Sequence, residues 1–161
     1  MKIINTKPDI QKSDKAVCFA CSWERRKAIF NLGKELNCNK LAFGHHRDDA
    51  LQTFMMNLLY HGSISSLPYS LSMFEGSLNL IRPLLDIWEN ELISLAKFRK
   101  FEAINKSCPH EDLSKRNYTK NLINNLGDTY PTAKINMFHA MDNIYSEYLP
   151  HSKNKSAKDS G

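Results

Sequence analysis

A short apolar segment that runs into a charged junction and then into a helical pattern constrains this fold most strongly. Residues 41–44 (LAFG) have the pattern of a buried strand, with turn residues on either side. The charged stretch 45–49 (HHRDD) follows, and apolar side chains then recur at helical spacing over 51–59. This order is typical of α/β proteins, in which helices connect parallel strands.

The remaining patterns extend this alternation and then become helical. Residues 62–77 predict a loop or weak hairpin, and 78–85 (LNLIRPLL) predict a strand that ends at Pro83. Further helices are predicted over 22–36, 89–101, 113–127 and 132–148. The expected fold is therefore an α/β fold, with an incomplete Rossmann-like parallel sheet and helices, followed by a helical C-terminal part.

The expected division of the chain follows the same patterns. Residues 1–104 are predicted to form the C-terminal portion of an α/β domain, 105–149 a helical region and 150–161 a disordered polar tail. No apolar run reaches the length of a membrane span, and the first residues lack the apolar core of a signal peptide. We therefore expect a cytoplasmic chain with no membrane partner.

The chain is mildly basic, and the basic charge is concentrated in one segment. The net charge is +5, and residues 97–120 carry seven Lys or Arg against three acidic side chains. Phe98, Phe101 and Tyr118 lie in this segment, and aromatic rings among cations can stack on bases while the cations bind phosphates. On composition alone, solvated helix faces are the slightly favoured interpretation.

Four cysteines, Cys18, Cys21, Cys38 and Cys108, leave several kinds of chemistry open. In a cytosolic chain we expect them to be reduced, and Cys38 is predicted to be a small buried side chain. A redox pair at Cys18 and Cys21 would leave Cys108 without a role. Zinc could take these three cysteines together with His110, whereas three thiolates alone would suit a [4Fe–4S] cluster with one open iron. The spacing does not separate zinc from iron–sulfur.

The charged junction lies where α/β proteins place their ligands, at the carboxyl end of a strand. Asp48 and Asp49 fall in the first turn of the predicted helix, where carboxylates stabilise the helix dipole. They could also hold Mg²⁺ on substrate phosphates. On these residues alone, the helix-start interpretation is favoured, and His45 and His46 are more often polar junction residues than ligands.

Positive charge follows the first cysteine pair directly. Arg25 lies four residues after Cys21, so on a helix the two side chains share a face. A cation there could stabilise thiolates or the charge that develops on a phosphate, although a solvated basic face is the plain alternative. The chain has six glycines, and their positions build neither GxGxxG nor GxxxxGK.

Four stretches taken together resemble one family. They are CFACSWERR (18–26), LAFGHHRDDALQTFMMNLLYHG (41–62), LIRPLL (80–85) and SCPHEDLSKR (107–116). In this order they are similar to the tRNA 2-thiocytidine synthetases (tRNA-cytidine sulfurtransferases) of the PP-loop superfamily, whose fold is adenine nucleotide alpha hydrolase-like. The likeness runs from about residue 18 to 149.

The resemblance implies an activity and a set of roles. Members of this family adenylate C2 of a cytidine in the tRNA anticodon loop with ATP and Mg²⁺, and then replace its oxygen with sulfur from a donor. The likeness implies that Cys18, Cys21 and Cys108 hold a [4Fe–4S] cluster, with zinc as the alternative. It further implies that the basic helices after residue 97 face the tRNA. It assigns catalytic roles to Asp48 and Arg25, and nucleotide binding to Gly44, His45 and Asp49.

The chain departs from this family in one respect. The SGGxDS pyrophosphate loop, which precedes the Cys-x-x-Cys pair in the family, does not occur in this sequence. We therefore expect a fragment that is inactive alone and is completed by a missing N-terminal segment or a second chain. An exposed sheet edge also predicts association, most simply as a homo-oligomer.

Three other functions are weighed against sulfur transfer. The alternative is a non-catalytic RNA-binding module that a metal or iron–sulfur site stabilises. A thioredoxin-like reductase and the tRNA-Ile lysidine synthetases rank lower. The lysidine synthetases share a GHxxDD-like motif but have no need of three cysteines.

Overall fold

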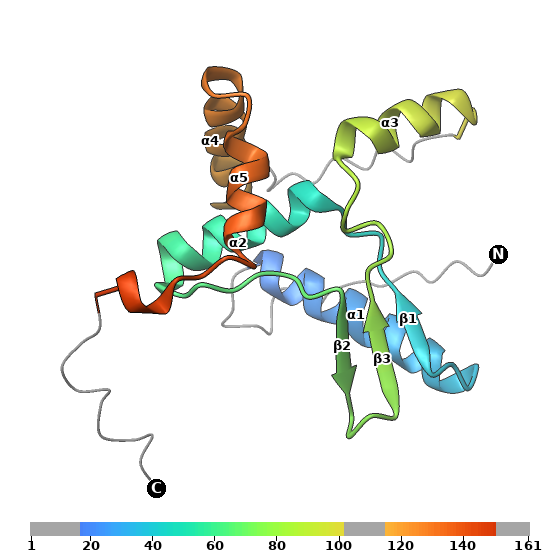
Figure 1. The fold of residues 1–161 in the computed structure, drawn as a ribbon. Coiled ribbons are helices and arrows are strands. Elements are labelled where there is room, and N and C mark those ends of the chain that lie inside the picture. The colour runs from blue at the N-terminus through green and yellow to red at the C-terminus, as the bar shows by residue number, and fades with distance from the viewer. Residues whose placement is uncertain (1–16, 102–114, 151–161) are drawn as a thin grey trace, which may run out of the picture.

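The computed structural model describes residues 17–101 and 115–150, which form five α-helices, three strands and a terminal 3₁₀ turn (Figure 1). The helices are α1 (Val17–Glu35), α2 (Arg47–His61), α3 (Glu89–Phe98), α4 (Lys115–Thr129) and α5 (Ala133–Ala140). The strands are β1 (Lys40–Ala42), β2 (Ser70–Met73) and β3 (Leu78–Ile81), and the 3₁₀ turn η2 spans Ser146–Tyr148. This architecture confirms the predicted α/β fold with a helical C-terminal part.

The described sheet is mixed, with the strand order β1-β3-β2. β1 runs parallel to β3, with Leu41 opposite Leu80, and β2 pairs antiparallel with β3, with Leu71 opposite Leu80. Residues 62–69 form no strand, and the hairpin joins β2 within the predicted loop to β3 beyond it, so that β2 adds an antiparallel edge strand to the parallel pair. In β3, Leu78 and Leu80 are buried and alternate with half-buried residues, as a strand with one covered face requires.

α1 contacts the sheet through β1 at a position where a side chain would not fit. A Cβ added at Gly33 would lie 2.9 Å from Cδ2 of Leu41, so the absent side chain lets the helix approach the strand. α1 then ends at a C-cap in which Asn37 has a left-handed φ of 52° and the Cys38 N–H donates to the Gly33 carbonyl at 2.8 Å. Cys38 follows this cap in an exposed position, so the prediction that Cys38 is buried was wrong.

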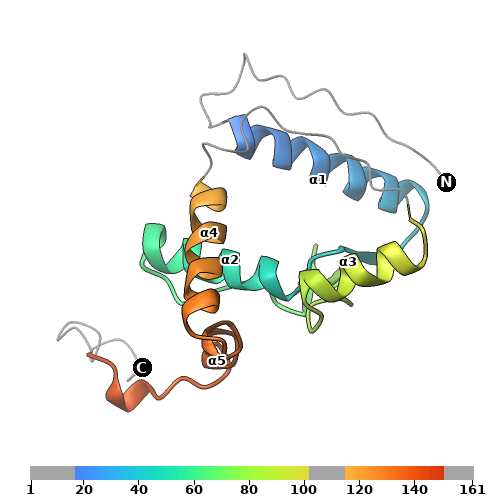
Figure 2. The same cartoon turned by 90° about the horizontal axis from the view of Figure 1, so that it is seen from above.

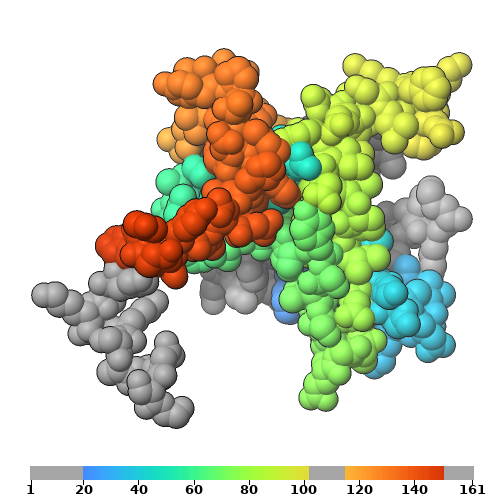
Figure 3. All heavy atoms as spheres, viewed as in Figure 1, coloured from blue at the N-terminus to red at the C-terminus, as the bar shows by residue number. Residues whose placement is uncertain are grey.

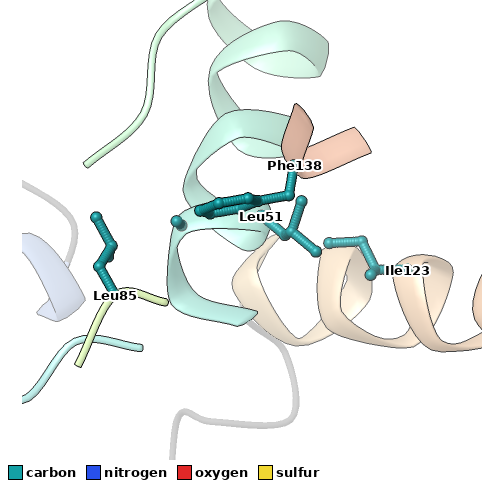
Figure 4. Packing of buried hydrophobic residues seen from close by; sticks show 5 residues of the cluster. Leu51, Leu85, Ile123 and Phe138 are labelled. Atoms are coloured by element: carbon teal, nitrogen blue, oxygen red, sulfur yellow. The ribbon is translucent and has the colours of Figure 1, made fainter. Parts of the chain in front are cut away.

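The main apolar core lies between α2 and the C-terminal helices, next to the sheet rather than on it. Leu51 and Ala50 of α2 pack with Ile123 of α4, Phe138 of α5 and Leu85, which follows β3 (Figure 4). Figure 2 shows α4 crossing α2, with α5 beyond the crossing. The core therefore joins the strand–helix unit to the helical end of the chain.

Two helices have a different first or last residue from the one predicted. α5 stops at Ala140, short of the predicted 132–148, and Ile144, Tyr145 and Tyr148 are exposed. The residues after the helix include Asp142 and Asn143, whose side chains favour turns over helix. α1 begins at Val17, five residues before the predicted start at 22, which places both cysteines of the Cys-x-x-Cys pair within the helix.

α3 has no buried residue. Leu95, Phe98 and Phe101 are exposed, and Leu92 and Ala96 are half-buried. The space-filling view shows α3 and the β2–β3 hairpin projecting as separate arms (Figure 3). No helix among residues 17–101 and 115–150 is long and apolar enough to cross a membrane.

The position of Leu51 makes it the most informative test of the core. Leu51 is 0% exposed, whereas Leu59 on the same helix is 49% exposed. We expect Leu51→Ala to lower the free energy of unfolding by about 2–5 kcal/mol, because it removes buried methyl groups and leaves a cavity. Leu59→Ala should change it by roughly 0.5 kcal/mol. Urea unfolding followed by circular dichroism measures both, and equal losses would contradict this core.

Candidate active site

The parallel strands β1 and β3 end at the same edge of the sheet, and two conspicuous stretches follow them there. Gly44 to Asp49 come after β1, and Arg82 comes directly after β3. A backbone hydrogen bond joins the two strand ends just before these residues, from the Phe43 N–H to the Ile81 carbonyl at 2.9 Å. The carboxyl edge of a parallel sheet is where α/β proteins bind their ligands.

A cavity of about 630 Å³ opens at this edge between α1 and the sheet. Trp23, Arg26 and Phe30 of α1 line it on one side. Phe43, His45 and Arg82 line it from the strand ends, and the segment 66–74 completes the wall. The cavity is thus mostly apolar and aromatic, with a few cationic groups, and its size falls within the range of about 300–1,000 Å³ typical of small-molecule sites.

Gly44 leaves room beside this cavity. Its φ is not left-handed, and a Cβ added at this position would meet no heavy atom within 4 Å. Neither conformation nor packing against the described residues therefore requires a glycine here. A position of this kind allows a ligand to approach the backbone closely, which agrees with the predicted role of Gly44 without testing it.

His45 is a neutral, partly buried imidazole. Its ring stacks on Phe43 with centroids 5.6 Å apart and an angle of 6° between the planes. Burial is the largest cause that lowers the pKa of His45 below 6.5; Asp49 opposes the shift, whereas Arg82, Arg116 and Arg26 add to it. Nδ1 is buried and has no hydrogen-bond partner in the described part of the chain. A neutral ring with a free nitrogen can accept or donate one hydrogen bond to a ligand.

Asp49 joins α2 to α4. Its Oδ2 accepts the backbone N–H of His46 at 3.1 Å, and its Oδ1 lies 2.5 Å from Nη2 of Arg116. Arg116 also donates through Nε to Oε1 of the buried Gln52 at 3.0 Å. The Asp49 carboxylate therefore both caps its own helix and binds a cation from α4.

Asp48 joins α2 to α3 and α5. Its Oδ2 accepts the backbone N–H of Glu89, at the start of α3, at 2.8 Å. Its Oδ1 lies 3.6 Å from Nζ of Lys134, while Lys120 pairs with Glu89 at 3.0 Å. Asp48 thus satisfies one of the free N–H groups of a helix start and faces a cation. A Mg²⁺ ion on either carboxylate would compete with Lys134 or Arg116.

The predicted residues fall into two groups. The α2 junction brings Gly44, His45, Asp48 and Asp49 together, as the sequence predicted. Arg25 and Cys21 lie on α1 and line neither the 630 Å³ cavity nor the small polar cavity of about 160 Å³ beside Asp49. The exposed Arg25 therefore keeps its predicted role only as a prediction, whereas the neighbouring Arg26 lines the larger cavity.

The predicted metal ligands are only partly described. Cys18 lies in the first turn of α1, Cys21 follows at i+3 as a free thiol, and Cys108 lies outside the described residues, as does His110. Within residues 17–101 and 115–150, no cluster of three or more His, Cys, Asp or Glu could hold a metal ion.

Sequence reasoning missed four cationic residues around this edge. Arg82 was visible in the sequence as a lone charge among the apolar residues of LNLIRPLL, and Arg26 as one turn beyond Trp23 on a helix. No local signal reveals Arg116 and Lys134, because only the packing of α4 and α5 on α2 places them beside Asp49 and Asp48.

The fold defines a Rossmann-like α/β domain with a charged cavity at the carboxyl edge of its sheet, where such domains bind ligands. Residues 3–126 match the PP-loop domain family. The chain therefore belongs to the PP-loop domain family.

Several relatives share this sequence over most of its length. The tRNA-cytidine(32) 2-sulfurtransferase of Bordetella petrii is 35% identical over 136 residues, which are 84% of this chain and 42% of that protein. The proteins of the same name from Psychromonas ingrahamii and Paraburkholderia phymatum are 35% and 36% identical, again over 84% of this chain, and are covered to 44% and 40%. The chain thus spans less than half the length of these relatives.

A solved structure shares the fold. The U34-tRNA thiolase NcsA from Methanococcus maripaludis, solved with its [4Fe–4S] cluster, superposes with a TM-score of 0.68 at 28% identity. The match covers 93% of this chain and 50% of NcsA. The likeness confirms the predicted fold class, while the predicted domain boundary at 104 stays a prediction.

The lowered pKa of His45 predicts a pH-dependent stability. Below pH 6.5 the unfolded chain binds a proton that the folded His45 resists, so the free energy of unfolding falls as the pH drops through this range. Above pH 6.5, His45 is neutral in both the folded and the unfolded chain, so its contribution to the free energy of unfolding no longer changes with pH. Unfolding at a series of pH values should show a shallower loss for His45→Gln than for the exposed-site control His61→Gln. Identical slopes in the two variants would contradict a buried neutral His45.

Proposed function

We propose that this chain forms part of a tRNA-cytidine 2-sulfurtransferase and acts in tRNA thiolation. The observation that carries the proposal is the identity of 34–36% to relatives of that name over 84–86% of the chain. The likeness to a tRNA thiolase at a TM-score of 0.68 supports the same reaction class. The substrate would be a tRNA cytidine, and the reaction would need ATP, Mg²⁺ and a sulfur donor. It would take place in the cytoplasm.

The residues at the carboxyl edge would bind and orient the nucleotide. Open space at Gly44 and the neutral ring of His45 support a role on the wall of the nucleotide pocket. Asp48 and Asp49 already face Lys134 and Arg116, so Mg²⁺ would have to displace these cations before it reached either carboxylate. Arg25 is proposed as the cation near the reacting phosphate because it is exposed one turn beyond Cys21.

The cysteines would hold the sulfur-transfer group. We propose Cys18, Cys21 and Cys108 as ligands of a [4Fe–4S] cluster, supported by the Cys-x-x-Cys spacing of the first two and by the cluster of the thiolase neighbour. When bound, such a cluster would supply an open iron on which sulfur can reside. Zinc, with His110 as a fourth ligand, is the competing occupant.

The tRNA would contact the exposed basic and aromatic side chains of α3 and α4. Phe98 and Phe101 project at the end of α3, and Tyr118 projects from α4. Exposed cations are close to these rings in the sequence, at Lys97, Arg99, Lys100 and Lys115. Rings that stack on bases next to cations that bind phosphates are the usual surface for single-stranded RNA.

We propose that a further polypeptide segment completes the ATP site. The chain spans 40–44% of the relatives' length and its sequence has no SGGxDS loop. The segment could precede this chain in a longer protein or come from another subunit, and a homo-oligomer is the simplest assembly that would cover the outer edge of the sheet.

Thiolation by a completed chain tests this function. A fusion would place the segment that precedes the matched region of the Bordetella petrii relative before this chain. We expect the fusion, with ATP, Mg²⁺ and sulfide, to form 2-thiocytidine in tRNA, detected by mass spectrometry of its nucleosides. The chain alone should form none. Asp48→Asn in the fusion should abolish the product, whereas Glu75→Gln in the exposed hairpin turn should not.

Each outcome of this experiment has a separate meaning. Product formed by the chain alone would overturn the proposed incompleteness. A folded fusion that binds tRNA without forming product would favour the second candidate, a non-catalytic RNA-binding module. The carboxylate contacts of Asp48 and Asp49, which already have structural partners, are the observation that keeps this second candidate open.

The cysteine assignment has its own test. We expect the anaerobically purified chain to be brown, with the broad visible absorption of an iron–sulfur cluster and about four irons per chain. Cys18→Ser, Cys21→Ser or Cys108→Ser should each lose the absorption. Cys38→Ser is the matched control, because Cys38 is exposed beyond the end of α1. A colourless protein with stoichiometric zinc that is lost in Cys108→Ser would overturn the cluster.

A further inference from the structure

Arg82 is a buried guanidinium without a carboxylate partner. It is 7% exposed, and no Asp or Glu of the described residues pairs with it. One nitrogen, Nη1, donates to the Pro68 carbonyl, and Nε is buried without a partner. A buried charge without a counter-ion is costly, so an unpaired arginine of this kind indicates a missing anion.

The surroundings of Arg82 add positive charge and no negative charge. Arg26, Lys27 and His45 line the same cavity, and no acidic side chain is among its lining residues. Burial lowers the pKa of Arg82, and repulsion from Arg26 lowers it further. Two guanidiniums that repel one another would both be stabilised by one anion bound between them.

Aromatic rings lie on the walls of the same cavity. Trp23 lines the cavity and is 58% exposed. Phe30, Phe43 and Phe74 also line it. The rings of Phe30 and Phe74 pack edge to face, with their centroids 6.0 Å apart. An indole that remains exposed beside cations is suited to stack on a base. A volume of about 630 Å³ is also large enough for one nucleotide.

We propose that Arg26 and Arg82 together bind the phosphate of a nucleotide whose base stacks on Trp23 and the neighbouring phenylalanines. The inference deepens the proposed function, on which it rests for the choice of a nucleotide. It assigns a phosphate site to two arginines that sequence reasoning passed over. The same chemistry serves a free nucleotide or a nucleotide within a single strand of RNA, and the experiment distinguishes them.

The test is direct binding to the full chain by isothermal titration calorimetry, with ATP, pentacytidylate RNA and inorganic pyrophosphate as separate probes. We expect Arg26→Gln, which removes an exposed charge, to weaken binding by about tenfold or more, as for a lost charge-assisted hydrogen bond. Lys34→Gln, an equal change of charge further along α1 and away from this cavity, should leave binding unchanged. Trp23→Ala should weaken nucleotide binding but not pyrophosphate binding.

Arg82 is tested by two variants because it is buried. Arg82→Lys retains the charge and loses the planar fork, and Arg82→Gln removes the charge. We expect both to weaken binding, Arg82→Gln the more, and circular dichroism checks that they fold. If Arg82→Gln does not fold, Arg26→Gln still decides the question.

The outcomes separate this inference from the proposed function. Binding of ATP alone assigns the site to a free nucleotide, and binding of the RNA alone assigns it to the RNA strand; both support the inference. If neither probe binds, or if Arg26→Gln behaves like Lys34→Gln, the inference is overturned. Binding without thiolation by the completed chain would leave this site standing while the proposed function failed.

Discussion

The first turn of α2 connects most of the described structure, because its three successive charged side chains together contact α3, α4 and α5. The Arg47 guanidinium lies over the rings of Trp88 and Phe138, 4.7 and 4.9 Å from their centroids. Asp48 accepts from the start of α3 and faces α5, and Asp49 binds Arg116 of α4. The apolar core begins with the next two residues, Ala50 and Leu51. The charged side chains at the start of α2 therefore contact the same C-terminal helices that the apolar core packs against α2.

This arrangement gives the two sides of the strand edge opposite electrostatic character. On the α4 and α5 side, each carboxylate has a cation, so charge is balanced within the described residues. On the α1 side, Arg26 and Arg82 line a cavity to which no acidic side chain of residues 17–101 and 115–150 contributes. Burial lowers the pKa of His45, Asp49 opposes this shift, and Arg82 and Arg26 on the α1 side add to it. A phosphate-bearing ligand would therefore be attracted to the α1 side.

The accuracy of the sequence-based predictions depended on whether local or distant contacts decide each feature. The strand, the charged junction and the helix over 41–59 were predicted correctly because turn residues and apolar spacing act locally. The apolar spacing of α3 does not decide its burial, because the described fold leaves Leu95 and Phe98 exposed. The burial of Cys38 was wrong because the cap at Asn37 turns the chain outward.

By itself, the sequence determined the α/β class, the position of the junction and the residues Gly44, His45, Asp48 and Asp49 at the strand edge. These follow from periodicity and from the rule that ligands lie at strand ends, both of which can be read along the chain. Only the tertiary structure decided which charges are paired. Arg116 and Lys134 reach the carboxylates through the packing of α4 and α5, while the buried Arg82 pairs with no Asp or Glu of the described residues. Pairing of charges depends on distances between residues far apart in the chain, and only folding sets those distances.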